Sequence, residues 1–233
     1  SDQAIAKMVA GVDVDLFRPD DELKRLAHKA LDSGVAEAFS AGDVDATCEI
    51  LKSSADGQEW IASFEESAEP WFNFSTGSGF YHRDKIWIEN IEVPFEFIRN
   101  YIENLKEGKD LNRPVEAIRA ERDRVVNEYT ELISTDEDRE TFQGKLGLAR
   151  TVFPYVENHN FYVEHWAHSV IWRKMRELGA IMVDQGFWEK PDDIFYLKRV
   201  EVEEMLWDYF VSWATPEAPA GPGYWPPIIA DRR

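Results

Sequence analysis

Apolar side chains recur at steps of three and four residues along most of this 233-residue chain, and this spacing constrains its fold more than any other feature. On an α-helix the repeat places apolar side chains in one stripe, which must be buried against a neighbouring element. The stripe is clearest in residues 23–31 and 95–105, each followed within a few residues by a glycine that can end a helix. The sequence therefore predicts an all-α fold, an irregular helical bundle.

Residues that favour helix ends divide this pattern into separate helices. Pro19 followed by acidic residues is typical of a first helical turn, Asp43 can cap a helix, and Ser134-Thr135-Asp136 can begin another. Pro154 is expected to close or kink the helix that begins there. The expected helices follow residues 19–34, 43–51, 60–64, 95–108, 114–132, 136–149 and 153–179.

The stretch WFNFSTGSGFYHRDKIWIENIEV, residues 71–93, breaks the helical pattern. Gly77 and Gly79 lie among small polar residues, and large aromatic residues flank them. Solvated connections are normally polar, so a loop this aromatic must pack against a core, a partner or a ligand. Packing over its own helices is the simplest of these interpretations. The glycine pair by itself is only a weak signal for a phosphate cradle.

These boundaries suggest one helical domain with four parts. Residues 1–69 form an N-terminal helical lobe, residues 70–93 the long aromatic-rich loop, and residues 94–215 the main helical bundle. Residues 216–233 are rich in proline and glycine, which predicts a linker-like tail.

Charge and cysteine content narrow the possible partners and compartment. With 45 acidic against 26 basic residues, the net charge of −19 repels phosphate backbones and anionic lipid headgroups. We therefore expect no nucleic-acid partner and no membrane partner. The sequence contains no apolar run of the roughly 20 residues that cross a bilayer. The lone Cys48 suits a reducing cytoplasm, which is the expected location.

Residues 153–179, FPYVENHNFYVEHWAHSVIWRKMRELG, place histidines and glutamates among large aromatic residues in one predicted helix. Helical spacing puts Phe161, His165 and His168 on one side, with Glu164 near enough to orient an imidazole. Buried imidazoles and carboxylates must be hydrogen-bonded or paired, and a cluster of them is typical of a functional site. The alternative is that each histidine is a core residue with its own partner.

Known metal-binding patterns do not fit this helix. The Glu-x-x-His spacing is absent, because Glu164 lies four residues before His168, and no such pair appears on another helix. The His-Glu-x-x-His order is also absent, because Glu164 precedes His165 and only two residues separate His165 from His168. The chain also lacks the P-loop, the dinucleotide-binding and the Gly-x-Ser-x-Gly motifs. The sequence predicts no metal site.

The segment RKMRELGAIMVDQGFWEKPDDIFYLKRVEVEEML, residues 173–206, resembles the region before the mobile phosphohistidine domain of phosphoenolpyruvate-utilising enzymes. Glu157-Asn158 is similar to an Arg-Glu-Asn motif of that family, although Val156 stands where the arginine would be. With its two aromatic segments, the chain resembles the helical substrate-binding region of aryl dikinases of the phenylphosphate synthase type. Rifampin phosphotransferases belong to the same group.

The resemblance implies a substrate-binding domain of a phosphotransferase that phosphorylates a phenolic hydroxyl. Such enzymes carry a phosphohistidine on a swivelling domain and bind ATP on an ATP-grasp domain. Neither domain has a matching segment in this sequence. We therefore expect no cofactor on this chain, with ATP and Mg needed in the complete enzyme. The expected partners are a phenolic small molecule and ATP-grasp and phosphohistidine domains or subunits.

A phenolic substrate needs an apolar slot, a group that accepts its proton, and cations where phosphoryl charge develops. His165 or His168 is the expected catalytic base, with His82 and His159 as alternatives. Arg150, Arg173 or Lys85 is the expected cation. The expected substrate-binding residues are Trp71, Phe72, Phe74, Phe80, Tyr81, Trp87, Glu157, Phe161, Tyr162, Glu164, Trp166, Trp172, Arg150 and Arg173.

Two other functional classes compete with this interpretation. A non-catalytic helical module that docks a partner subunit predicts that Trp71, Phe72, Tyr81 and Trp87 form an exposed patch. A metal-dependent enzyme predicts zinc or iron in the purified protein.

Overall fold

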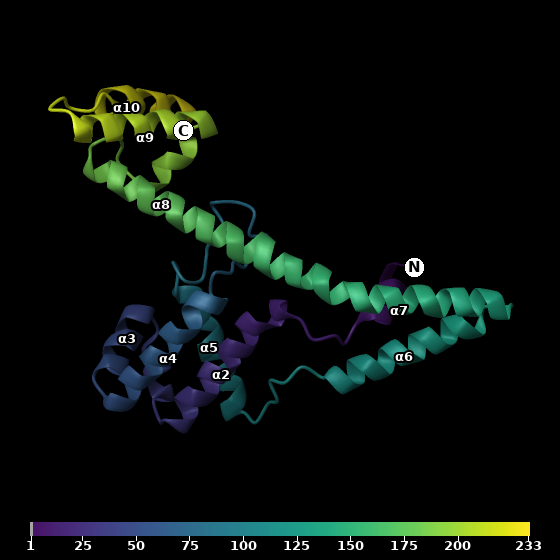
Figure 1. Ribbon diagram of the computed structural model, residues 1–233. Coiled ribbons are helices and arrows are strands. Elements are labelled where there is room, and N and C mark those ends of the chain that lie inside the picture. Colours follow the sequence, from purple (N-terminus) through teal and green to yellow (C-terminus); the bar gives the residue numbers. More distant parts are fainter. Residues whose placement is uncertain (1) are drawn as a thin grey trace.

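The computed structural model describes residues 2–233, and within that range it contains helices, loops and one isolated antiparallel bridge between Ser75 and Ile86, but no strand (Figure 1). The predicted all-α class is therefore confirmed. The α-helices are α1 (Asp2–Val9), α2 (Arg18–Asp32), α3 (Val44–Lys52), α4 (Ala55–Trp71), α5 (Glu92–Lys106), α6 (Val115–Glu131), α7 (Asp136–His159), α8 (His168–Asp184), α9 (Arg199–Ala214) and α10 (Gly221–Arg232). Shorter helices are η1 (Asp15–Phe17), η2 (Ala36–Ala41), the π-helix η3 (Asn160–Ala167) and η4 (Pro191–Tyr196).

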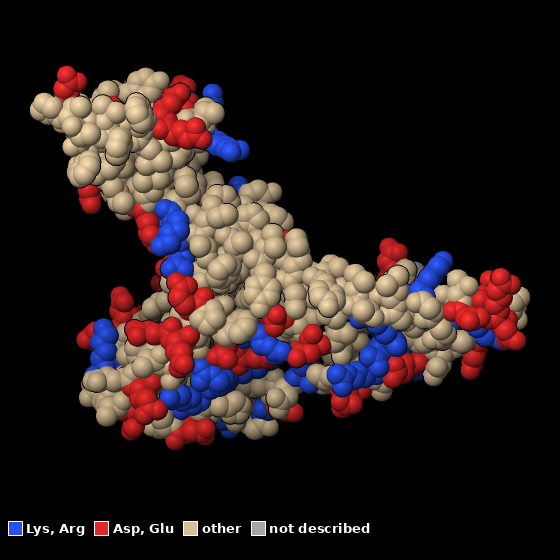
Figure 2. Space-filling view, viewed as in Figure 1, with Lys and Arg blue, Asp and Glu red and all other residues tan. Residues whose placement is uncertain are grey.

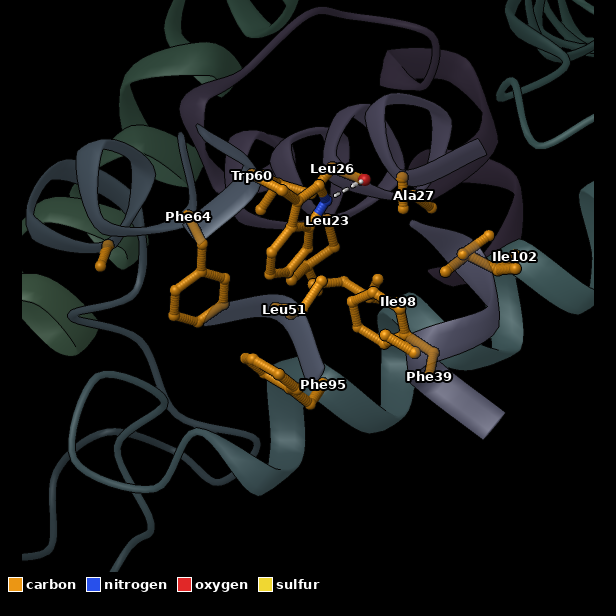
Figure 3. Close-up of a cluster of buried hydrophobic side chains, with 14 of the residues drawn as sticks. Leu23, Leu26, Ala27, Phe39, Leu51, Trp60, Phe64, Phe95, Ile98 and Ile102 are labelled. Atoms are coloured by element: carbon orange, nitrogen blue, oxygen red, sulfur yellow. Dashed lines mark hydrogen bonds between the residues drawn. The ribbon is translucent and has the colours of Figure 1, made fainter. Parts of the chain in front are cut away.

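Helices α2 to α5 and η2 surround the largest hydrophobic core of the described chain. Trp60 of α4 lies at its centre, and its indole N–H donates to the Leu26 carbonyl of α2 at 2.9 Å (Figure 3). The Phe39 and Phe95 rings meet Trp60 edge-on, at centroid distances of 5.0 and 5.8 Å. Large buried aromatic side chains dominate the energetics of a core, so we expect this core to hold the loop residues Phe72 and Trp87 firmly in place.

Helix starts follow the predicted local signals. Pro19 lies in the first turn of α2, and the Asp43 carboxylate accepts a hydrogen bond from the Ala46 amide at 2.8 Å. The Thr135 hydroxyl caps α7 by accepting from the Asp138 amide at 3.1 Å. Each contact satisfies a backbone donor that the first helical turn leaves free.

One helical rod runs from the start of α7 through η3 to the end of α8 (Figure 1). Pro154 does not close this segment: it lies inside α7, which continues to His159 and then into η3. A proline removes one backbone donor, and the hydrogen bonds of neighbouring residues carry the helix past that gap. The hydrogen-bond register changes only at residues 160–167, where the chain becomes a π-helix.

The two ends of the rod pack against different elements. At one end, α1 contacts both α6 and α7 around a small core of Met8, Val125, Val126 and Leu146. At the other end, α8 packs against η4, α9 and α10 around a second core that includes Met182 and Trp225.

Packing divides the chain differently from the expected boundaries at residues 94 and 216. Helix α5 belongs to the N-terminal bundle, because Phe95, Ile98 and Ile102 lie in its core, so residues 94–215 do not form one bundle. The expected linker-like tail contains helix α10 instead.

Helix α10 begins at a favourable proline and continues through Pro226 and Pro227 in its interior. Gly221 and Pro222 occupy its first turn, and the Asp208 carboxylate accepts from the Gly221 amide at 2.8 Å. Trp225 is buried, and its burial fixes the helix against α9 and η4. A proline- and glycine-rich composition therefore does not identify a linker here.

Candidate functional site

The aromatic loop, which spans residues 72–91 between α4 and α5 in the structure, packs onto the π-helical segment η3 of the rod. The Phe74 ring stacks on the His165 imidazole with their centroids 4.2 Å apart, and Trp71 and Phe74 both contact the buried Phe161 ring. Backbone hydrogen bonds from Trp87 to Phe74 and from Ile88 to Phe72 hold the two arms of the loop together. Residues far apart in the sequence thus meet at one place.

Gly79 allows the tip of the loop to touch the rod. Its φ is +78°, and a Cβ there would lie 2.2 Å from the Glu164 carbonyl oxygen. The Gly79 carbonyl accepts from the Trp172 indole at 3.3 Å, and its amide donates to the Asp84 carboxylate at 3.2 Å. Only glycine combines this backbone conformation with so close an approach.

His165 is the most buried histidine of the loop–rod contact. The residue is 7% exposed, and its Nδ1 atom is buried without a hydrogen-bond partner in the described chain. Burial lowers the pKa of this imidazole below its ordinary value of 6.5, which favours the neutral form. One turn further along, the Ser169 hydroxyl is also buried without a partner. Unpaired buried polar atoms are rare, and these two lie about one turn apart on the same side of the rod.

His168 lies at the rim of the same contact. It is half-buried, its Nδ1 atom lies 3.2 Å from the Glu164 carbonyl oxygen, and its ring lies between Phe80 and Trp172. His168 is therefore already oriented by its own helix.

His82 and His159 lie outside the His165 contact. The His82 ring stacks on Phe195 at 4.2 Å, and burial lowers its pKa although the residue is partly exposed. His159 is exposed, with Nδ1 3.8 Å from a carboxylate oxygen of Glu164. Glu157 lies two residues before His159 on α7 and is half-buried.

The expected cations are not gathered around His165. Arg150 lies on α7, in the part of the rod that packs against α1, and it donates to the Met8 carbonyl at 3.0 Å. Arg173 lies nearer the loop but donates to Asn73 at 2.6 Å and to Glu69 at 3.3 Å. Lys85 is exposed.

The aromatic residues expected to bind substrate fall into three groups. Phe72 and Trp87 are buried within the α2–α5 core, so the exposed loop patch required by a docking module does not form. Trp71, Phe74, Phe161 and Trp172 make the loop–rod contact. Phe80, Tyr81, Tyr162 and Trp166 are exposed around it, and the Tyr162 hydroxyl donates to Asp15 at 3.0 Å. Figure 2 shows a largely uncharged surface over this junction.

Several contributing residues carried no distinctive sequence signal. Ser169 is one serine in an apolar helix, and Asp84 is one charge in a loop. Arg176 was not expected either, yet it joins the loop to the rod by donating to the His82 carbonyl and to Glu89 at 2.7 Å. Helical spacing alone could have placed Ser169 beside His165.

Residues 2–233 offer neither a metal-binding cluster nor a membrane-spanning helix. These residues hold no group of three or more His, Cys, Asp or Glu side chains placed to bind a metal ion. None of the helices they form has both the length and the apolar character needed to cross a membrane.

Comparison with known proteins gives one match. Over 123 residues, 53% of its length, the chain is 22% identical to an uncharacterized phosphotransferase, YvkC, of Bacillus subtilis (strain 168). The chain spans 14% of the length of that relative. No family model matches the chain, and no solved structure does. The similarity is therefore to a short part of a phosphotransferase.

Proposed function

We propose that the chain is the substrate-binding region of a phosphotransferase that phosphorylates a phenolic hydroxyl, with the phosphohistidine and the ATP chemistry on other domains or subunits. The similarity to part of a phosphotransferase supports the general class. The two buried polar atoms without partners, His165 Nδ1 and Ser169 Oγ, beside stacked aromatic rings support the substrate.

His165 is the proposed proton acceptor. A phenol titrates near 10, like tyrosine, so at neutral pH its oxygen carries a proton that must leave as the bond to phosphorus forms. A neutral imidazole with a free ring nitrogen can accept that proton, while the nitrogen–phosphorus bond of the incoming phosphohistidine breaks. Burial keeps His165 in the neutral form that this step requires.

Phe74 marks the position of the substrate ring. It stacks on His165 with an interplanar angle of 23°, which is the arrangement that a planar aryl substrate would adopt. Substrate and Phe74 cannot occupy the same space, so binding displaces the Phe74 ring. The Ser169 hydroxyl then lies one helical turn from His165 and can hydrogen-bond to the phenolic oxygen.

Thermal-shift titration of the chain with phenol and catechol tests the binding step, with cyclohexanol as the non-aromatic control. Phenol at one hundred times its dissociation constant adds about 2.7 kcal/mol of stability. His165→Gln should weaken this shift, whereas His159→Gln, on the exposed part of the same rod, should leave it unchanged. An equal shift in both variants would contradict the assignment of His165.

Single-turnover transfer in the complete enzyme tests the chemical step. His165→Gln should lower phosphoryl transfer to phenol by roughly a hundredfold or more, the usual contribution of a positioned acid or base. Phosphorylation of the carrier histidine by ATP should continue, because that half-reaction belongs to other domains. Parent-rate transfer per folded molecule would show that His165 only packs.

A docking module remains a second candidate because α9 exposes apolar side chains on its outer face. Trp207 and Trp213 are 67% and 79% exposed, and Phe210 lies beside Trp207. Exposed apolar patches of this kind commonly mark protein interfaces. If docking is the main role, Trp213→Glu abolishes capture of the ATP-binding subunit, and phenol produces no thermal shift.

A further inference from the structure

The α2–α5 bundle contains a hollow that no step of the proposed function uses. Its volume is about 320 Å³, and its lining includes the buried side chains of Trp60, Phe64 and Phe95. Ile88, from the end of the aromatic loop, closes one side, and Ala68 of α4 lines another. None of the histidines of the loop–rod contact lines it.

The size and lining of the hollow distinguish it from a packing defect. Protein interiors are filled about as densely as organic crystals, and a dry cavity of about 150 Å³ lined by aliphatic and aromatic side chains already holds benzene. This hollow has about 320 Å³ and a mainly apolar wall, so it falls within the range of small-molecule sites. The partly exposed Ile61, Ile88 and Ile91 side chains of its wall gain free energy when a ligand removes them from water.

The charged side chains lie only at the edge of the hollow. Lys52 and Glu65 are exposed, and Lys52 pairs with Glu49 at 2.9 Å, so the interior itself offers no charge to a ligand. The Cys48 thiol also lines the hollow, and burial raises its pKa, which keeps it neutral. An ionised ligand would lose its hydration there without gaining a partner.

We propose that this hollow, called the α2–α5 cavity below, is a second binding site, which takes an uncharged aromatic molecule of one or two rings. It is separate from the phenol site at His165, and its ligand needs no hydroxyl group because the cavity lining includes aromatic rings. The occupant is held by burial and ring contacts with Trp60, Phe64 and Phe95.

Cys48 is the single cysteine of the chain, so its rate of thiol labelling reports directly on the cavity. Toluene is a suitable probe because it has no hydroxyl group for the phenol site. At ten times its dissociation constant, toluene should slow labelling about tenfold, since only the ligand-free form exposes the thiol to reagent. An unchanged rate at saturating toluene would overturn the proposal.

Two variants fill the cavity and a third serves as the control. Ala68→Phe inserts a ring into the wall from α4, and Ile88→Phe narrows the opposite side, so each should abolish protection by toluene. Ala62→Phe adds the same ring to an exposed position of α4 and should leave protection intact. Melting curves identify any variant that fails to fold. If the folded cavity-filling variants keep full protection, toluene binds elsewhere and the proposal is wrong.

His165→Gln separates this proposal from the proposed function. The variant should retain toluene protection of Cys48 while losing the phenol shift. If neither parent nor variant shows a phenol shift but toluene still protects Cys48, the cavity assignment holds and the phenol assignment fails. If the parent shows the phenol shift without toluene protection, the phenol assignment holds and the cavity assignment fails.

Discussion

The α2–α5 bundle and the α6–α7 hairpin both consist of helices, but the apolar stripes of α6 and α7 are weaker, and the hairpin buries far fewer apolar side chains. The bundle encloses a continuous core centred on Trp60, whereas the hairpin and α1 share only Met8, Val125, Val126 and Leu146. Leu132 and Leu148 of the hairpin are exposed. The helices with the stronger apolar stripes therefore form a large packed core, and the hairpin forms a thinly packed arm.

The position of the candidate site follows from this difference. The loop that carries Phe74 is anchored in the bundle through Phe72 and Trp87, while His165 lies on the rod that continues from the hairpin. The α2–α5 core thus anchors the loop side of the site, and the contact between Gly79 and Glu164 joins the loop to the rod.

Matched leucine truncations give the largest expected contrast. Leu26→Ala removes a fully buried side chain from the bundle and should cost about 3–5 kcal/mol of unfolding free energy. Leu146→Ala, in the small hairpin core, should cost about 2 kcal/mol, because fewer neighbours surround the space it leaves. Denaturant unfolding measures both values. Equal losses would show that the hairpin is as tightly packed as the bundle.

A pair of glycine substitutions tests the loop–rod contact. Gly79→Ala and Gly34→Ala both place a side chain at positive φ, but only the Gly79 Cβ would collide with backbone, since nothing lies within 4 Å at Gly34. We expect Gly34→Ala to cost about 1 kcal/mol and Gly79→Ala about 2–3 kcal/mol.

Gly79→Ala should also move the loop away from η3 and expose the His165 side chain to solvent. The Phe74 ring would leave His165, and the exchange of the amides of loop residues 74–79 with deuterium should accelerate. Unaltered exchange, or the same stability as Gly34→Ala, would contradict close packing at Gly79.

The burial of His165 predicts a dependence of stability on pH. Its pKa is lowered from 6.5 in the folded chain, so its contribution is complete above about pH 6.5 and is lost as the pH falls below that value. His165→Gln should reduce the drop in melting temperature between about pH 7.5 and pH 5.5, whereas His159→Gln should not. The same drop in both variants would show that His165 titrates as in solvent.

The smallest expected effect concerns helix α10. Arg232 holds the Glu201 carboxylate with contacts of 2.6 and 2.7 Å and lowers its pKa from 4.5 to about 2. This contribution is present above about pH 4.5 and is lost as the pH falls toward 2. Glu201→Gln should slightly lower the melting temperature at neutral pH and remove that part of the acid sensitivity. Glu203→Gln, an exposed neighbour on α9, should do neither.

Local signals predicted the helices well because each acts over a few residues. The Asp43 cap and the start of α7 at Asp136 are confirmed, as is the all-α class. The sequence did not predict α10, because this helix depends on residues outside the tail. Asp208 caps its first turn, and Trp225 is buried against other helices. Composition carries no information about such contacts.

The candidate site was predicted in part. Its aromatic and histidine segments were identified, and the structure brings Phe74, Phe161 and His165 together. Spacing along one helix could not reveal that the rod carries Arg150 away to α1, or that Gly79 lets the loop touch Glu164. Those facts depend on how two distant segments cross, which periodicity does not encode.

The ring-nitrogen NMR signals of His165 test the central claim most directly. Phenol titrated into the ¹⁵N-labelled chain should shift the His165 resonances progressively to a plateau, because the phenolic hydroxyl becomes the missing partner of Nδ1. The His159 resonances should remain in place, since that ring is exposed on an earlier turn of the rod. Unmoved His165 signals at phenol concentrations that stabilise the chain would contradict a phenol site at His165.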